Sequence, residues 1–274
     1  MGAILGVVPS AADLAPAIAP LRSDPAHTAI LSDIDGTLAP IVRHAGDAHV
    51  AEPMRRALMA CSDRYGLTAC VSGRRAADAK RMVGLGTIAY VGNHGTELLP
   101  ALGGDLQVDP AFAEWAPRIQ AFAQEAWTPE MRKLRMRSED KGGIVAIHWR
   151  GVPDEDAAHA AAIALAERVE AEGLAVHWGR KVLELRPPIP MDKGRGIAWI
   201  LDGTPIRQAM YVGDDHTDVD AFRGLRAMVD DGRLDLALCV GVRSDELPDD
   251  VAAESDLLVD GEQGVRAMLE ALAA

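Results

Sequence analysis

The chain is poor in cysteine and has no pattern typical of a disulfide framework. Its 274 residues include three cysteines, an odd number, and none of them stand in CxxC spacing: Cys61, Cys70 and Cys239. Widely spaced cysteines argue against a disulfide-bonded or zinc-cluster fold and are typical of proteins in a reducing compartment. We therefore expect a cytoplasmic protein.

Basic residues are also scarce. The sequence has 28 lysines and arginines against 41 aspartates and glutamates, so its formal net charge is −13. This excess of negative charge argues against a nucleic-acid partner, because such binding depends on neutralising phosphates with basic side chains. A small phosphorylated substrate remains open, since a bound divalent cation and a few local basic groups can outweigh the global charge.

Long apolar runs are missing as well. Charges or prolines interrupt every stretch of ~18 residues, the length that a membrane-spanning helix needs, so we expect no membrane partner. The N-terminal segment MGAILGVVPSAADLAPAIAPL has no basic residue before its apolar part and contains several prolines, so we expect no secretory signal there. Nothing in the sequence implies an obligate protein partner.

Short apolar runs alternate instead with helical patterns at both ends of the chain. Alternation of this kind is typical of an α/β fold with a doubly wound parallel sheet. The predicted strands are residues 28–32, 67–72, 87–92, 209–213 and 236–242. The predicted helices are residues 51–65 and 74–83, one that begins near Lys193 and one that follows Asp218.

The middle of the chain has a different pattern. It contains two helical stretches, near 110–127 and 154–172, and three strand candidates, 145–150, 174–178 and 181–186. This pattern predicts an inserted α+β domain with an antiparallel sheet. Glycines near 103–104 and the proline-rich turn at 186–190 mark its limits. The expected division is 1–105 and 187–274 for the core and 106–186 for the insert.

Two aspartates follow the first predicted strand, in the segment Asp33-Ile34-Asp35-Gly36-Thr37. The carboxyl ends of parallel strands line the ligand crevice of an open sheet. There, one carboxylate can attack phosphorus and hold a metal while the other transfers a proton to the leaving group. Gly36 allows a sharp turn. The alternative is a solvated Asx turn without any catalytic role.

A second acidic segment, Val212 to Asp218 (VGDDHTD), follows a later strand. Mg²⁺ prefers oxygen ligands and shares carboxylates with phosphate and water, so two acidic loops at neighbouring strand ends predict a Mg²⁺ site. The alternative is a helix cap, since Thr217 and Asp218 are good capping residues. A cap does not explain the adjacent Asp214–Asp215 pair.

Two smaller elements complete the pattern. Ser72-Gly73-Arg74 ends the second predicted strand, where a hydroxyl and amides can bind phosphate oxygens. Lys193 begins a helix after the insert and can neutralise an attacking carboxylate. Each element alone is common in proteins without such a site, but the order Asp-x-Asp, Ser, Lys, Asp-Asp at successive strand and helix ends predicts phosphoryl transfer.

These four segments resemble the motifs of the haloacid-dehalogenase (HAD) superfamily of phosphatases. The resemblance implies that Asp33 is the nucleophile, that Asp35 is the general acid and base, and that Ser72 and Lys193 orient the phosphoryl group. It implies Mg²⁺ as cofactor, held by Asp33, the backbone carbonyl of Asp35, and Asp214. Asp215 and Asp218 complete the expected metal set, mostly through water.

The match extends to the trehalose-6-phosphate phosphatases of that superfamily, through VSGRR, GNHGTEL, GDDHTD and GRKVLELRP. It implies hydrolysis of trehalose 6-phosphate to trehalose and phosphate, with the insert as a mobile cap over the sugar. The residues expected to bind this phosphorylated disaccharide are Gly36, Thr37, Arg74, Asn93, His94, Glu139, Lys141, His148, Arg150 and Glu184. One departure is Val219, where the family commonly has glutamate.

Alternation in the predicted cap strands places Val145, Ile147 and Trp149 on one face and His148 and Arg150 on the other. A charged face suits a polyhydroxylated ligand, although antiparallel sheets also expose polar faces to water alone. The open alternatives are a phosphatase for sucrose phosphate, mannosyl-phosphoglycerate or a trehalose-like pseudosugar phosphate, a phosphomutase, and a non-catalytic phosphosugar-binding protein. The glycines of Gly84-Leu85-Gly86 imitate a dinucleotide fingerprint, but a strand rather than a helix is predicted after them.

Overall fold

The computed structural model describes residues 11–42, 48–244 and 247–274. It divides into two compact units. The first is formed by the chain up to Gln107 and from Met191 onward, and the second is Val108–Pro190. In the described residues, no helix has the length and apolar character that crossing a membrane requires.

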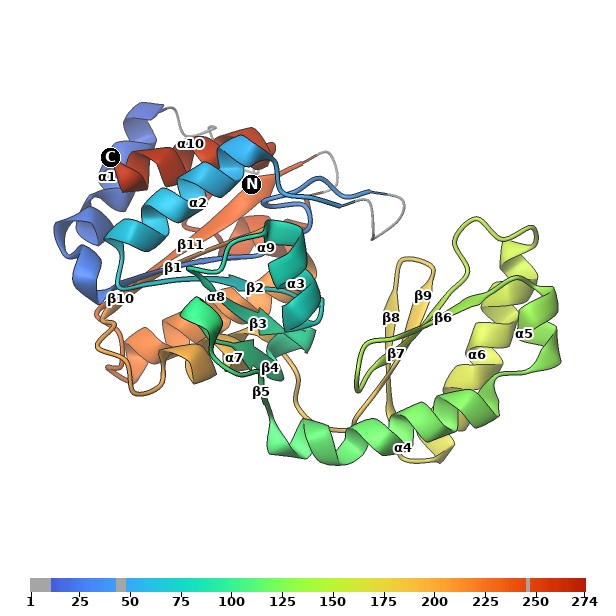
Figure 1. The fold of residues 1–274 in the computed structure, drawn as a ribbon. Coiled ribbons are helices and arrows are strands. Elements are labelled where there is room, and N and C mark those ends of the chain that lie inside the picture. Colours follow the sequence, from blue (N-terminus) through green and yellow to red (C-terminus); the bar gives the residue numbers. More distant parts are fainter. Residues whose placement is uncertain (1–10, 43–47, 245–246) are drawn as a thin grey trace, which may run out of the picture. The chain divides into compact units, whose positions relative to one another are not determined.

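An eight-stranded sheet forms the centre of the first unit (Figure 1). Its strand order is β12-β11-β10-β1-β2-β3-β4-β5, parallel from β12 to β3 and antiparallel between β3 and β4. The expected doubly wound α/β fold is therefore confirmed. The strands are β1 (Thr28–Ser32), β2 (Leu67–Val71), β3 (Ala89–Gly92), β4 (Glu97–Leu99), β5 (Gln107–Val108), β10 (Gln208–Gly213), β11 (Leu236–Arg243) and β12 (Leu257–Asp260).

Helices cover both faces of this sheet (Figure 1). One face packs against α1 (Ala11–Ser23), α2 (Glu52–Arg64), α3 (Ala76–Val83) and α10 (Gly261–Ala273). The other face packs against α7 (Lys193–Leu201), α8 (His216–Asp230) and α9 (Asp249–Glu254). Strands that are covered on both sides need continuous apolar sequence, which explains runs such as TAILS and AMYVG.

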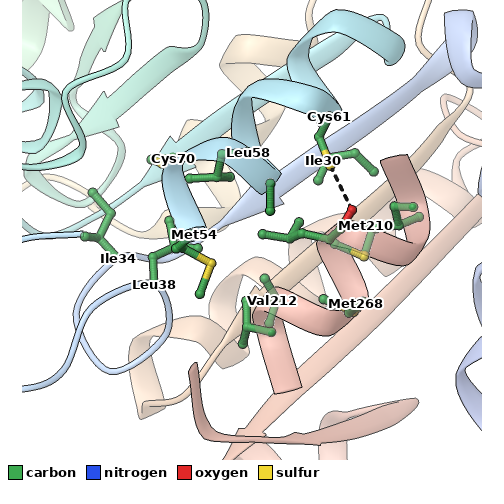
Figure 2. Packing of buried hydrophobic residues seen from close by; sticks show 14 of the residues in the cluster. Ile30, Ile34, Leu38, Met54, Leu58, Cys61, Cys70, Met210, Val212 and Met268 are labelled. Carbon is green, nitrogen blue, oxygen red and sulfur yellow. Dashed lines mark hydrogen bonds between the residues drawn. The ribbon is translucent and has the colours of Figure 1, made fainter. Parts of the chain in front are cut away.

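The packing of the first face is shown in Figure 2. Cys61 of α2 and Met268 of α10 lie over Ile30 of β1 and Met210 of β10, and all four are almost fully buried. The Cys61 thiol donates to the backbone carbonyl of Leu269 at 3.5 Å, so it joins the two helices. All three cysteines are buried and free of disulfides.

The second unit has a four-stranded antiparallel sheet with the order β6-β7-β9-β8. Its strands are β6 (Arg137–Asp140), β7 (Val145–His148), β8 (Ala175–Gly179) and β9 (Val182–Arg186). Its helices are α4 (Pro110–Ala126), α5 (Pro129–Lys133) and α6 (Glu155–Ala171). Val145, Ile147 and Trp149 join the buried cluster with these helices, as the alternation predicts.

Several predicted boundaries differ from the structure, and three of them bear on the site or on the motifs. Helix α8 begins at His216 rather than after Asp218, because Asp215 is its N-cap and Asp218 lies in its first turn. Strand β7 ends at His148, so Arg150 lies in a turn and not on the strand face where alternation placed it. Strand β3 begins at Ala89 rather than at residue 87. As predicted, a strand and not a helix follows Gly86.

Candidate active site

The predicted segments meet where the winding of the large sheet reverses. Strand β1 lies between β2 and β10, so the residues after these three strands share one edge of the sheet. Asp33 follows β1, and its backbone N–H donates to the carbonyl of Val212 in β10 at 2.9 Å. This reversal point is where open α/β sheets bind ligands.

Lys193 occupies the first turn of α7, which Asp192 caps by accepting the N–H of Arg195 at 2.7 Å. The ammonium of Lys193 is almost fully buried and lies between two carboxylates. Its Nζ donates to Oδ1 of Asp33 at 2.8 Å and to Oδ1 of Asp218 at 2.7 Å. The predicted lysine and nucleophile are therefore in direct contact, although 160 residues separate them in the sequence.

Asp218 is fully buried, and both of its carboxylate oxygens are occupied. Oδ1 accepts from Lys193 and from the hydroxyl of Tyr211 at 2.6 Å. Oδ2 accepts from the backbone N–H groups of Asp214 at 2.9 Å and Asp215 at 3.0 Å. Asp218 therefore fixes the loop and the lysine. Its partner Tyr211 was not predicted, because the segment AMYVG looks like ordinary core sequence.

Gly36 allows the first acidic loop to approach the second. Its φ is +85°, and a Cβ built on it would lie 2.1 Å from Oδ2 of Asp214. The neighbouring Thr37 hydroxyl donates to Oδ1 of Asp214 at 2.8 Å. Any larger residue at position 36 would displace the Asp214 carboxylate, which explains the glycine in both steric and conformational terms.

Asp33, Asp214 and Asp218 each offer a carboxylate oxygen, and these oxygens lie within 4.8 Å of one another. Hard oxygen donors of this kind suit Mg²⁺. Because both oxygens of Asp218 already accept protein donors, Asp33 and Asp214 are the better candidates for direct ligands. The side chain of Asp215 accepts the N–H and the hydroxyl of Thr217, both at 2.7 Å.

Burial, and after it the neighbouring charges, shifts the pKa values of these groups. Burial raises the pKa of Asp33 well above its usual value, and Lys193 opposes this shift only in part. Burial, with the charge of Asp218, raises the pKa of Asp214 to about 7. For Lys193, burial favours the neutral amine, but Asp218 and Asp33 outweigh it and raise its pKa. The site therefore has an excess of negative charge, which a divalent cation would neutralise.

Ser72 and Arg74 follow β2 next to this cluster. The Ser72 hydroxyl is almost fully buried and accepts the backbone N–H of Arg74 at 3.2 Å. The Arg74 guanidinium pairs with the carboxylate of Asp35, by Nε to Oδ2 at 2.6 Å and by Nη2 to Oδ1 at 2.7 Å. The side chain of the predicted acid and base thus contacts an arginine.

The segment Asn93-His94-Gly95 has three consecutive residues with positive φ: 46°, 53° and 97°. Two non-glycine residues in this region indicate strain held by surrounding contacts. The amide of Asn93 is fully buried and donates to Glu97 at 2.8 Å, while Glu97 also accepts the N–H of Ala76. Asn93 therefore organises the loop, and the His94 ring lies against Gly73, where a Cβ would come within 2.7 Å of it.

The predicted sugar-binding residues of the second unit fall in two groups. Glu139 and His148 are hydrogen-bonded at 2.8 Å across β6 and β7, and this contact lowers the pKa of Glu139. Lys141 donates to Glu184 at 2.7 Å on the same face of the sheet. Arg150 is separate from both groups and donates to the carbonyl of Arg180.

Glu184 is nearly buried and has two cationic partners. Lys141 occupies Oε1, whereas Arg186 occupies Oε2 through Nε at 2.9 Å and Nη2 at 2.6 Å. Arg186 was not predicted as a site residue. Its alternation with Glu184 along β9, which places both on one face, is the signal that identifies it.

A family model described as trehalose-phosphatase matches residues 31–246, which include every core segment above. The chain belongs to the trehalose-phosphatase family. Curated relatives include the trehalose-phosphate phosphatases of Mycobacterium marinum, 36% identical over 209 residues, and of Mycobacterium bovis, 38% identical over 200 residues. Each alignment covers 71% of this chain and 50% of the relative.

An uncharacterized glycosyl hydrolase of Mycobacterium tuberculosis is 36% identical over 207 residues, 72% of this chain but 15% of that protein. The chain thus spans half or less of the length of these curated relatives. Among solved structures, the C-terminal domain of Candida albicans trehalose-6-phosphate phosphatase is similar in fold, with a TM-score of 0.72 at 20% identity. That alignment covers 94% of this chain and 96% of that one.

One residue departs from the pattern expected for the trehalose-phosphatase family. Val219 follows Asp218 in α8 and is 2% exposed, packed within the apolar cluster under the sheet. It lies beside the carboxylate cluster in sequence but adds no polar group to it. The four carboxylates of Asp33, Asp214, Asp215 and Asp218 are unaffected by this difference.

Proposed function

We propose that this chain hydrolyses trehalose 6-phosphate to trehalose and inorganic phosphate, with Mg²⁺ as its cofactor. The observation that carries the proposal is the Asp33–Lys193 contact of 2.8 Å beside Asp214, at the reversal point of a trehalose-phosphatase chain. A buried carboxylate that faces a lysine is poised to act as a nucleophile toward an anionic phosphate. The trehalose-phosphate relatives indicate the substrate.

In the first step, the carboxylate of Asp33 attacks phosphorus and an aspartyl phosphate forms. The bond between phosphorus and the sugar oxygen breaks, and Asp35 gives a proton to that leaving oxygen. In the second step, Asp35 takes a proton from a water molecule, whose oxygen attacks phosphorus and restores the Asp33 carboxylate. The two aspartates have separate roles because Asp33 is buried beside Lys193, while Asp35 is about one-third exposed and points to Arg74.

The phosphoryl oxygens need positive charge and hydrogen-bond donors around them. Lys193 supplies the charge, since its ammonium is fixed by Asp218 and Asp33. Ser72 supplies a hydroxyl at the end of β2. Asp33 and Asp214 would hold Mg²⁺, which screens the repulsion between an anionic nucleophile and an anionic phosphate.

The polar sheet face of the second unit is the proposed source of sugar contacts. Glu139 and His148 are partly exposed there and can exchange their mutual hydrogen bond for sugar hydroxyls. Lys141, also partly exposed, can turn from Glu184 to a sugar hydroxyl. The carboxylate of Glu184 is occupied by Lys141 and Arg186, so its proposed role is to orient these two cations. A cytoplasmic location is part of the proposal, and the three free buried cysteines support it.

The test is phosphate release by the purified protein with Mg²⁺, on trehalose 6-phosphate beside glucose 6-phosphate, sucrose 6-phosphate and mannosyl-phosphoglycerate. We expect a strong preference for trehalose 6-phosphate and nearly complete loss of turnover in Asp33→Asn. Turnover of an aryl phosphate but of none of these sugars would support the chemistry and exclude the proposed substrate. Substantial activity in Asp33→Asn would exclude Asp33 as the nucleophile.

A further inference from the structure

The contact between Arg74 and Asp35 joins two loops that both belong to the proposed reaction. The side chains are 22% and 35% exposed, and the guanidinium uses Nε and Nη2 to contact both carboxylate oxygens. The loops are brought together because β1 and β2 are neighbours in the sheet, with Ser32 opposite Cys70. The pair thus depends on the fold and not on sequence proximity.

The backbone of Arg74 is anchored at the proposed phosphate site. Its N–H donates to the Ser72 hydroxyl at 3.2 Å, and its carbonyl accepts the N–H of Asn93 at 2.8 Å. Backbone movement is therefore restricted, whereas the long side chain can rotate. Its guanidinium can reach different partners from a fixed starting point close to Ser72.

An arginine fork matches a carboxylate and a phosphate equally well in geometry. The Nε–Nη2 edge that binds Asp35 cannot bind two phosphoryl oxygens at the same time. Asp35 has the corresponding constraint, because a carboxylate with both oxygens on one guanidinium cannot turn to the leaving oxygen of a substrate without breaking a bond. While the pair is intact, the Nε–Nη2 edge of Arg74 cannot bind the phosphoryl group and Asp35 cannot reach the leaving oxygen.

We propose that Arg74 exchanges Asp35 for the substrate's phosphoryl group, and that this exchange releases Asp35 toward the leaving oxygen. Arg74 is thus a phosphate-binding residue in the complex and a positioning residue for Asp35 in the free protein. The partial exposure of the pair favours the exchange, since exposed ion pairs are weak and a phosphate carries more charge than a carboxylate. This inference rests on the proposed function.

The exchange makes Asp35 and phosphate competitors for one guanidinium, which a double-mutant cycle can measure. The probe is inorganic phosphate with Mg²⁺, titrated calorimetrically into the wild type, Asp35→Asn, Arg74→Gln and the double variant. We expect Asp35→Asn to lower the phosphate Kd by about tenfold when Arg74 is present, because the fork loses its anionic partner. In the Arg74→Gln background, the same substitution has a smaller effect.

Simple charge repulsion predicts the opposite order. Asp35 repels phosphate more strongly when no arginine neutralises it, so its removal would then matter most in the Arg74→Gln background. An equal or larger effect in that background would overturn the exchange, and so would an Arg74→Gln variant that binds phosphate as tightly as the wild type. Arg75→Gln is the matched control, because it removes an adjacent positive charge that lies 3.9 Å from Glu97 and does not contact Asp35. In the Arg75→Gln background, Asp35→Asn should change the phosphate Kd as much as it does in the wild type.

Phosphate release from trehalose 6-phosphate by the wild type separates this inference from the proposed function. A wild type that neither turns over any phosphate ester nor binds phosphate contradicts both. A wild type that turns over the substrate and binds phosphate, but lacks the expected order in the cycle, contradicts the exchange alone. Unfolding curves for all the variants establish that the differences in Kd arise in folded protein.

Discussion

The hydroxyl of Tyr211 donates a 2.6 Å hydrogen bond to Oδ1 of Asp218, the same oxygen that receives the ammonium of Lys193. Burial and the charge of Asp218 raise the pKa of Tyr211 well above its usual value, so the phenol remains a donor at all physiological pH values. A core tyrosine thereby helps to hold the lysine against Asp33. The site therefore includes, besides its charged residues, the buried Tyr211 of β10.

Tyr211→Phe is therefore expected to lower kcat by about tenfold with little change in KM, because Lys193 loses part of its support while the substrate contacts remain. Steady-state kinetics on trehalose 6-phosphate measure this split. Tyr90→Phe is the matched control. Tyr90 lies in β3 of the same sheet, and its hydroxyl donates to the backbone carbonyl of Leu85, away from the carboxylates. Both variants should lose about 1–2 kcal/mol of stability. Equal kcat values in the two variants would contradict a role for Tyr211 in the site.

Without the proposed Mg²⁺, the stability of the protein should depend on the ionisation of Asp214. The folded-state pKa of about 7 lies above the ordinary value of 3.8, so the metal-free fold favours the protonated acid. The stability from this group is complete below pH 3.8 and is lost as the pH rises toward 7. The loss is at most about 4 kcal/mol.

Urea unfolding in EDTA at several pH values checks this, with Asp214→Asn as the reference that cannot titrate at this position. We expect the variant to gain stability relative to the wild type between pH 4 and pH 7. Added Mg²⁺ at pH 7.5 should stabilise the wild type and leave the variant nearly unchanged. If the difference in unfolding free energy between the wild type and Asp214→Asn does not vary with pH, Asp214 is ionised in the metal-free fold.

Gly36→Ala should damage the proposed metal site directly, because the new Cβ would lie 2.1 Å from the Asp214 carboxylate. We expect a loss of Mg²⁺ affinity of about tenfold or more, measured by calorimetry, together with lower turnover. Gly203→Ala provides the control: its φ is also positive, at +67°, but no atom lies within 4 Å of the new Cβ. It should cost about 1 kcal/mol of stability and leave Mg²⁺ affinity unchanged.

Glu184→Gln should affect substrate choice more than chemistry. It leaves Lys141 and Arg186 without their shared carboxylate, which we expect to destabilise the protein by about 3 kcal/mol. Hydrolysis of trehalose 6-phosphate should fall much more than hydrolysis of para-nitrophenyl phosphate, which needs no sugar contacts. Glu155→Gln, which breaks the exposed pair with Lys181 in the same unit, should change neither rate. Equal losses on both substrates in Glu184→Gln would exclude a role in sugar binding.

Sequence patterns predict five of the eight strands of the core sheet, β1, β2, β3, β10 and β11, because strands buried on both faces must be continuously apolar. The short strands β4, β5 and β12 were not predicted. The strand at 28–32 has the predicted bounds, and the helix at 51–65 differs by one residue at each end. Strand β6 has the sequence RSED, which has no apolar alternation, so its existence depends on pairing with β7 and could not be predicted. Helix α8 begins early because Asp215 and Asp218 form a reciprocal cap.

The residues of the candidate site also divide into those that the sequence predicts and those that it does not. Motif spacing identified Asp33, Ser72, Lys193 and Asp214 as residues that the fold would bring together, because strand ends share one edge of the sheet. It did not identify the Arg74–Asp35 pair, which depends on the side-chain directions of two loops. It also missed Tyr211, since nothing in an apolar strand distinguishes a phenol that fills space from one that donates to a buried carboxylate.

The placement of β1 between β2 and β10 has a consequence during synthesis on the ribosome. Thr37 and Asp214, which are hydrogen-bonded in the finished fold, are separated by 177 positions, or roughly 20 s of translation at about 10 residues per second. Throughout that interval the nascent chain has the Asp33 loop without Asp214, and for most of it also without Lys193. One edge of the apolar strand β1 also remains unpaired, which is a hazard for aggregation. The proposed active site is therefore incomplete until Asp214 is made, and a product truncated before Lys193 would retain Asp33 without the lysine and the second acidic loop.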